Sequence, residues 1–256
     1  MRRLIFVDGD IILHKACHAA EMEIYWGEGD WTLSLNEEQA KTIAREMLED
    51  IRLACSAKKS TIRMCFSNGK SFRKEIYPDY KANRKNQRKP LGMRAMKRWL
   101  SHEYKTIQYD YLEADDVMGI HMTKPGKQIK IGVSIDKDMK TIPGTHYNPD
   151  TGESFEITEA EADYNFYKQV LTGDSTDNYP GCPGVGPKTA DKILGQCDPK
   201  DYWSAVENTY WKNNVVNELE MARLARILRW SDFDFKSKTP LLWRKDGHRI
   251  FRTVPL

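Results

Sequence analysis

Acidic side chains stand at the points of this sequence where apolar segments end. Asp8 follows the apolar run 4–7, and Asp136 follows a second run that begins at residue 129. In a parallel α/β sheet, functional residues collect beyond the carboxyl ends of the strands. We therefore expect eight carboxylates to converge at one edge of the fold: Asp8, Glu113, Asp115, Asp116, Asp136, Asp138, Asp174 and Asp177.

Several neighbouring carboxylates cannot all ionise at neutral pH unless their pKa values rise or cations bind. A single acid after a strand is usually only a cap or turn residue, so the prediction depends on the joint pattern. Oxygen ligands without matching His or Cys favour Mg²⁺ or Mn²⁺ over zinc. Two Mg²⁺ ions about 3.5 to 4 Å apart suit in-line displacement at phosphorus. We expect Mn²⁺ to be able to substitute for Mg²⁺.

The basic residues are concentrated in one part of the chain. Residues 70–105 contain twelve Lys or Arg and three acids, so this segment carries +9 while the rest of the chain carries −6. Aromatic residues lie between these cations, as expected of a nucleic-acid contact, although a basic stretch is often only a solvated face. An acidic cluster beside a basic segment predicts a metal-dependent nuclease.

A second phosphate contact is predicted near residues 181–190. Gly184 and Gly186 precede a helix start whose backbone amides would be exposed, and Lys188 and Thr189 follow. Such a site binds phosphate without reading base sequence. An ordinary turn is the alternative explanation.

The composition is that of a globular protein. The 256 residues are 40% hydrophobic and 30% charged, with a net charge of +3, and fit one large domain with or without a small appendage. The chain has no apolar window long enough to span a membrane, and its first apolar run is too short for a signal peptide, so we expect a cytoplasmic location. Five cysteines without a C-x-x-C pair indicate reduced, packed thiols.

Strand and helix patterns alternate over the first part of the chain. We predict strands at 4–7, 62–66, 106–109 and 129–135, and helices at 40–51, 93–104, 159–171, 187–194, 199–211 and 215–229. The fold class is therefore α/β, with a twisted, mostly parallel sheet, flanking helices and a helical C-terminal region. The expected division is a core at 1–156, containing the basic segment 70–105, and a region at 157–256 packed on it as one unit.

Several local predictions are more detailed. We expect a tight turn after the first strand, an extended segment at 136–138, and a helical turn that places Asp174 and Asp177 on one face. Tyr25, Trp26 and Trp31 are placed in a glycine-containing loop. We expect three tryptophans at helical positions to lie in the core: Trp203, Trp211 and Trp230.

In their order along the chain, these motifs resemble the 5′-nuclease family, which includes flap endonucleases and polymerase-linked 5′→3′ exonucleases. The resemblance rests on V-D-G-D at 7–10, Y-K-A-N-R at 80–84, E-A-D-D at 113–116, D-K-D at 136–138, G-D-S-T-D-N at 173–178 and G-V-G-P-K-T-A at 184–190. Details at 72–75, 116–119, 140–143 and 221–229 are most similar to the exonucleases of short-tailed T-odd coliphages.

The resemblance implies roles for individual residues. One metal would be held by Asp8, Glu113 and Asp115 with Asp116 nearby, and another by Asp136, Asp138 and Asp174 with Asp177 close. Lys81 and Arg84 would contact the scissile phosphate beneath a helical gateway. Tyr80 would stack on a terminal base, and Arg73 and Lys85 would also bind substrate.

The same resemblance implies a structure-specific 5′→3′ exonuclease or flap endonuclease of phage DNA replication or degradation. Its substrate would be DNA with 5′ ends or flaps, with RNA–DNA hybrid as a further substrate. Residues 184–190 would form the hairpin of a helix-hairpin-helix motif, where K⁺ could bind. We expect a monomer.

One position departs from the family pattern. Relatives carry an Asp at the end of the second strand, where this chain has Asn68. We expect Asn68 to be a metal ligand all the same. Asn keeps the oxygen but loses the charge, so either the site tolerates a neutral ligand or the activity is reduced. Two alternatives therefore stay open: a catalytically impaired DNA-binding form, and a single-strand ribonuclease of the related PIN-type fold.

Overall fold

A six-stranded sheet forms the centre of the computed structural model, which describes residues 3–245 and 250–251. The strands are β1 (Arg3–Asp8), β4 (Ile62–Cys65), β5 (Lys105–Ile107), β6 (Ile129–Val133), β7 (Gly144–Asn148) and β8 (Glu153–Ile157). Their order is β5-β4-β1-β6-β7-β8, and only the edge strand β8 is antiparallel to its neighbour. This confirms the predicted α/β fold with a mostly parallel sheet.

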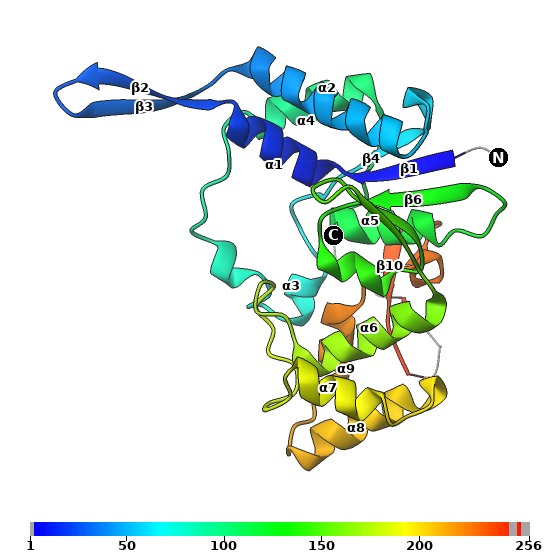
Figure 1. Cartoon of the computed structure of the whole chain (residues 1–256). Helices are drawn as coiled ribbons and strands as arrows, with labels where there is room; N and C mark the ends of the chain where they lie inside the picture. Colours follow the sequence, from blue (N-terminus) through cyan, green and yellow to red (C-terminus); the bar gives the residue numbers. More distant parts are fainter. Residues whose placement is uncertain (1–2, 246–249, 252–256) are drawn as a thin grey trace.

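The central strand β1 is apolar because both of its faces are covered. Ile5 and Val7 pack with α1 (Gly9–Ala19), α2 (Glu37–Ala54) and α4 (Met93–Glu103), whereas Phe6 packs in a second cluster with α5 (Ala114–Met122). Asn36 caps α2 by accepting a hydrogen bond from the Gln39 amide at 3.1 Å. The sheet therefore lies between two layers of helices (Figure 1).

The C-terminal helices form a third cluster below the sheet in Figure 1. They are α6 (Glu159–Thr172), α7 (Pro187–Leu194), α8 (Tyr202–Lys212) and α9 (Glu218–Ala225), followed by a small sheet of β9 (Phe233–Asp234), β10 (Thr239–Leu242) and β11 (Ile250–Phe251). Tyr80 belongs to this cluster although it comes from the basic segment. The shorter elements are α3 (Arg73–Ile76) and the 3₁₀ turns η1 (Lys59–Thr61), η2 (Ala82–Arg84), η3 (Lys137–Thr141), η4 (Pro199–Asp201) and η5 (Trp230–Asp232).

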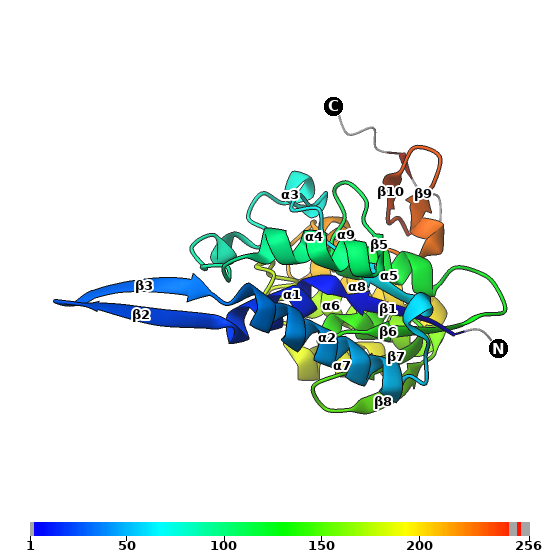
Figure 2. The ribbon, with the colours of Figure 1, turned by 90° about the horizontal axis from the view of Figure 1, so that it is seen from above.

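A β-hairpin projects from the molecule where a loop was predicted. It consists of β2 (Glu21–Gly27) and β3 (Asp30–Leu35), paired antiparallel (Figure 2). The turn residues Glu28 and Gly29 both have positive φ, as hairpin turns require. Exposed residues occupy both faces of this hairpin, so the alternation of its residues does not mark a buried face.

Three further predictions about local structure were wrong. Asp8 is followed directly by α1 and not by a turn, because its carboxylate caps that helix. The last predicted helix ends at Ala225 and not at 229, because the Leu224 and Arg226 carbonyls accept hydrogen bonds from Arg73. Trp211 is 73% exposed and lies outside the core.

No helix within the described part of the chain is both long and apolar enough to cross a bilayer.

Candidate active site

The first carboxylate lies where β1 meets α1. Asp8 accepts hydrogen bonds from the backbone amides of Asp10 and Ile11, at 3.1 and 3.3 Å. Burial, the nearby Asp10 carboxylate and, to a smaller degree, Asp136 raise its pKa to about 7. A buried carboxylate with this pKa would be stabilised in its charged form by a cation.

The second group of carboxylates opens α5. Glu113 is the N-cap of this helix, and Asp115 and Asp116 occupy its first turn, so one oxygen from each lies within 4.8 Å of the others. Burial and the charges of Asp116 and Glu113 raise the pKa of Asp115 well above its usual range. Although burial opposes ionisation of Glu113, Lys81 and Arg73 hold its pKa at about 2.

Asp116 forms a buried ion pair with Arg73. Its two oxygens accept hydrogen bonds from the guanidinium at 2.7 and 2.8 Å, and one of them also accepts from the Leu228 amide at 3.1 Å. Arg73 is only 1% exposed, so its predicted contact with substrate is contradicted. Arg73 also donates to Glu113 at 3.0 Å, so this one guanidinium holds both carboxylates at the start of α5.

The third group comes from η3 and from the turn at 174–179. The Asp136 carboxylate accepts from the Asp138 amide at 2.8 Å and caps η3, so the predicted extended segment is wrong. Asp174 forms a β-bridge with Tyr179 instead of opening a helical turn. Its carboxylate accepts from the Asp177 amide at 3.1 Å and from Lys137 Nζ at 3.0 Å. These backbone and lysine contacts set a tight turn in place of the predicted helical one.

Asp138 and Asp174 line a cavity of about 240 Å³. Burial and the charges of Asp136 and Asp174 raise the pKa of Asp138 to about 7. Lys137 lowers the pKa of Asp174, although burial opposes this. Lys137, Lys140 and Lys168 line the same cavity, so lysine charges partly offset those of the two carboxylates while no metal is bound.

Residues 80–84 connect the second and third groups. Lys81 Nζ lies 2.5 Å from Glu113 and 3.4 Å from Asp177, and Arg84 donates to Asp177 at 2.6 Å. The Tyr80 hydroxyl lies 2.7 Å from Asp177 and 3.0 Å from Glu113. Tyr80 is 2% exposed, so its burial contradicts the predicted stacking on a base.

Asn68 lies beside a carboxylate that the sequence analysis did not single out. Its Nδ2 donates to the Asp110 carboxylate, and its backbone amide donates to Leu112 O at 3.2 Å. Asp10 was also overlooked, although its spacing from Asp8 was a usable signal; its carboxylate accepts from the Ser67 amide at 3.0 Å. The Asn68 loop is therefore held between α1 and the segment that follows β5.

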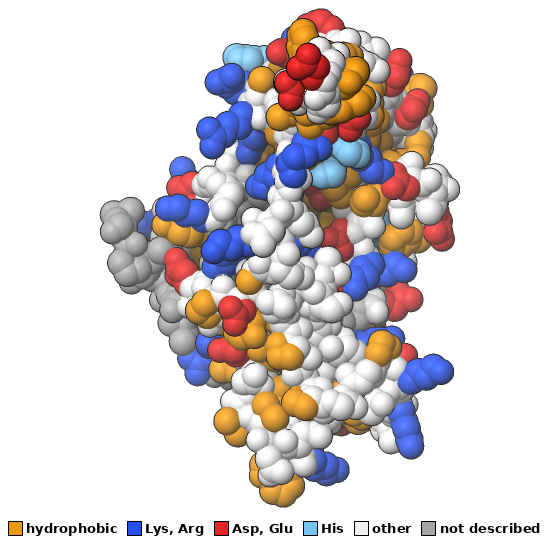
Figure 3. Space-filling model, turned by 90° about the vertical axis from the view of Figure 1, so that its left-hand side faces the viewer, with side chains coloured by type: hydrophobic (Ala, Val, Ile, Leu, Met, Phe, Trp, Pro, Cys, Tyr) orange, Lys and Arg blue, Asp and Glu red, His pale blue; other side chains and the backbone are white. Residues whose placement is uncertain are grey.

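The predicted phosphate-contact residues lie on the surface. Gly184, Gly186, Lys188 and Thr189 are exposed at the start of α7, whose N-cap Gly186 has no side chain to occupy the first amides. Lys85 is exposed beside η2. Figure 3 shows Lys and Arg side chains gathered on the upper half of the face that carries residues 82–92. These placements agree with a phosphate-contacting surface, and the individual roles stay predictions.

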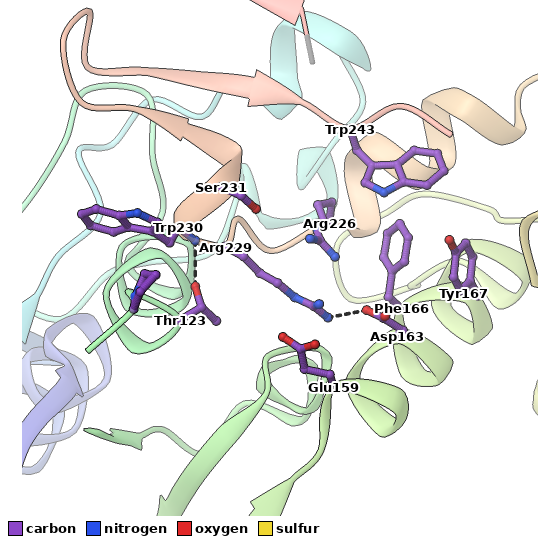
Figure 4. A pocket seen from close by; sticks show the side chains of 11 residues that line it. Thr123, Glu159, Asp163, Phe166, Tyr167, Arg226, Arg229, Trp230, Ser231 and Trp243 are labelled. Carbon is purple, nitrogen blue, oxygen red and sulfur yellow. Dashed lines mark hydrogen bonds and ion pairs between the residues drawn. The ribbon is translucent and has the colours of Figure 1, made fainter. Parts of the chain in front are cut away.

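A separate cavity of about 380 Å³ lies between α6 and residues 226–231 (Figure 4). Arg229 extends across it and pairs with Asp163 at 2.7 Å. None of the predicted site residues lines this cavity. It is therefore distinct from the acidic edge.

Comparison with known proteins gives consistent matches. Residues 3–163 match the family described as "5′-3′ exonuclease, N-terminal resolvase-like domain". The exonuclease of Escherichia phage T7 is 31% identical over 94% of this chain and 93% of its own length, and the exodeoxyribonuclease of Enterobacteria phage T3 is 29% identical over 94% and 92%. The structure of the T5 D15 protein co-crystallised with metal ions superposes with a TM-score of 0.60, at 16% identity, over 88% of this chain and 89% of that one.

Proposed function

Because the chain belongs to the 5′→3′ exonuclease family, we propose that it is a metal-dependent nuclease that hydrolyses DNA at 5′ ends and flaps. The observation that carries this proposal is the position of residues 80–84, which place Lys81 and Arg84 on carboxylates of the acidic edge. Cations beside a cluster of carboxylates that would hold metal suit phosphodiester hydrolysis, because positive charge offsets the negative charge that develops on the phosphoryl group.

The donor set fits divalent metal ions. The side chains are oxygen donors, and Asp8 and Asp138, with pKa values near 7, lie among other carboxylates. We assign one Mg²⁺ to Asp8, Asn68, Glu113 and Asp115, and another to Asp136, Asp138 and Asp174. Bound in this way, the ions would acidify the attacking water and offset charge on the phosphoryl oxygens. Mn²⁺ would replace Mg²⁺.

The chain's own cations complete the site. Lys81 and Arg84 are held by Glu113 and Asp177 when no substrate is present, so an entering phosphate exchanges one anionic partner for another. Tyr80 keeps Glu113 and Asp177 at a fixed separation. These residues therefore orient the scissile phosphate and stabilise the negative charge that develops on it.

The exposed start of α7 would contact the duplex away from the cut. Gly184, Gly186, Lys188 and Thr189 bind backbone phosphate without reading sequence, in a helix-hairpin-helix arrangement that would also take K⁺. Lys85 would contact the strand that enters the site. We extend the proposal to RNA in RNA–DNA hybrids, to action as a monomer, and to phage DNA replication or degradation in the host cytoplasm.

The proposal is tested by cleavage of a 5′-labelled flap duplex in Mg²⁺, in Mn²⁺ and in chelator. Cuts at the flap junction and 5′ end that appear only with metal support it. Cleavage confined to single-stranded RNA would instead identify a PIN-type ribonuclease.

Asn68 favours one alternative function. Its neutral side chain faces Asp110, so the first metal would be held with one charge fewer, and the protein would bind flaps without cutting them. Tight binding with no turnover in either metal by this chain, together with cleavage in Asn68→Asp, would identify such an impaired form. Binding without cleavage by either protein would instead leave only a DNA-binding function.

A further inference from the structure

Three exposed aromatic side chains of the β2–β3 hairpin have no part in the proposed cleavage site. Tyr25, Trp26 and Trp31 are 54%, 68% and 59% exposed. Figures 1 and 2 show this hairpin projecting well beyond the sheet. Exposed aromatic clusters of this kind mark interaction sites, because burial would stabilise them.

The aromatic residues divide between the two faces of the hairpin. Tyr25 lies opposite Trp31 in the strand register, and their ring centroids are 4.5 Å apart. Trp26 follows Tyr25 and points to the other face, where its Nε1 donates to Thr32 at 2.7 Å. Tyr25 and Trp31 therefore form one platform, which Trp26 does not share.

The platform face continues to the basic segment. Glu21 and Leu35 lie opposite each other at the hairpin root, on the same face as Tyr25 and Trp31 by the alternation of the strands. Glu21 accepts from Arg88 at 2.6 and 2.7 Å and from the Leu91 amide at 2.8 Å. The face that carries the aromatic pair is therefore the face joined to residues 88–91.

The charges of the two segments are opposite. Residues 21–35 contain four acids and no Lys or Arg, whereas residues 84–98 contain seven Lys or Arg and no acid. The hairpin repels phosphate and the basic segment attracts it. A nucleic-acid strand would therefore place its phosphates along the basic segment and only its bases against the rings.

We propose that Tyr25 and Trp31 form a stacking platform for unpaired bases at the 5′ end of the strand that is cut. The inference rests on the proposed nuclease function. A strand whose phosphate meets Lys81 and Arg84 continues past Arg88, which is joined to the hairpin root. Stacking uses the π-face that every base has, so the platform accepts a flap of any sequence.

Binding without turnover tests the platform. Fluorescence anisotropy in chelator would compare a duplex bearing a 5′ flap of about 15 nucleotides with the same duplex ending blunt. We expect Trp31→Ala and Tyr25→Ala each to weaken flap binding at least about five-fold, which corresponds to about 1 kcal/mol, and to leave blunt-duplex binding unchanged. Trp31→Phe, which keeps a ring, should retain binding.

Trp26→Ala is the matched control, because it removes an exposed tryptophan from the opposite face of the same hairpin. It should bind both DNAs as the unmodified protein does. The inference is overturned if Trp31→Ala binds the flap normally, if Trp26→Ala is impaired equally, or if the defect appears with a 3′ overhang instead. Failure of the unmodified protein to bind either DNA would refute the proposed function itself.

Discussion

At the residue scale, Lys81 contacts carboxylates from two separate parts of the acidic edge, Glu113 and Asp177. We expect Lys81→Ala to lower the single-turnover cleavage rate of a flap duplex about 10²- to 10³-fold, because a charge beside the developing negative charge is lost. Lys74→Ala, which removes an exposed cation of the same basic segment, should cleave normally. Equal losses in the two variants would show that only the net charge of the segment matters.

We propose that residue 68 influences how firmly the first metal is held. In Asn68→Asp the new carboxylate would face Asp110, so we expect the metal-free protein to lose about 1 kcal/mol of stability through like-charge repulsion and lost hydrogen bonding. A bound cation relieves this repulsion, so half-maximal cleavage should need less Mg²⁺. Titration of cleavage rate against Mg²⁺ concentration checks this. A requirement that is unchanged in Asn68→Asp would remove residue 68 from the ligand set.

His121 makes folding stability depend on pH. Burial, with Lys124 and Lys130 nearby, lowers its pKa from 6.5 to about 4, and Tyr109 bonds to its ring nitrogen at 3.0 Å. Between pH 4 and pH 6.5, His121 is protonated in the unfolded chain but neutral in the folded protein. The contribution of His121 to folding stability is therefore complete above pH 6.5 and is lost as the pH falls toward 4. The loss should be about 1 to 3 kcal/mol.

Urea denaturation at several pH values would measure this effect. His121→Gln removes the titrating group while keeping a side chain that can accept from Tyr109, so its free energy of unfolding should fall less over the same interval. Parallel pH profiles for the two proteins would exclude His121 as the cause.

At the element scale, the carboxylates of the site also begin helices. Asp8 caps α1, Glu113 caps α5 and Asp136 caps η3. Negative charge is favoured at a helix N-terminus, so each helix partly offsets the repulsion among these acids. The same carboxylates therefore form the acidic edge and start the helices behind it.

The start of α6 allows a test of capping alone. Thr158 and Glu161 form a capping box, with the Thr158 hydroxyl accepting from the Glu161 amide at 3.2 Å. Thr158→Ala should lower the free energy of unfolding by about 1 kcal/mol, whereas Thr158→Ser should keep most of it. Chemical denaturation measures both variants. Cleavage by Thr158→Ala should be normal at a temperature where it is folded, and a lost activity there would implicate α6 in the reaction.

At the scale of the whole molecule, Arg73 joins distant parts of the chain. It pairs with Asp116 and donates to the carbonyls of Leu224 and Arg226, which belong to the C-terminal region. We therefore propose that residues 1–156 and 157–256 unfold together. Arg73→Met should cost about 3 to 5 kcal/mol, because Asp116 would be left as an unpaired buried charge.

A double variant provides the control. Asp116→Leu in the Arg73→Met background removes the unpaired charge, so the loss of stability should be smaller than in the single variant. Denaturation followed by circular dichroism and by tryptophan fluorescence should give coincident transitions. Separate transitions for the two probes would show that the two regions fold independently.

The sequence alone determined which predicted strands are followed by acidic residues. Apolar runs ending in Asp8 or Asp136 predict strand ends at one edge, because parallel strands align their carboxyl ends. The Thr158 box and the Pro187 helix start were correctly predicted, because caps depend on neighbouring residues. The order of such local motifs along the chain also carries the resemblance to the nuclease family.

Only the tertiary structure decided which charged groups meet. The family resemblance implies Arg73 and Tyr80 as substrate contacts, yet long-range packing buries both against carboxylates far along the chain. The Asn68–Asp110 contact likewise joins segments that are far apart in sequence. Local patterns specify which residues end a strand or begin a helix. The partner of each side chain depends on how the layers pack, because desolvation and charge pairing act across the whole fold.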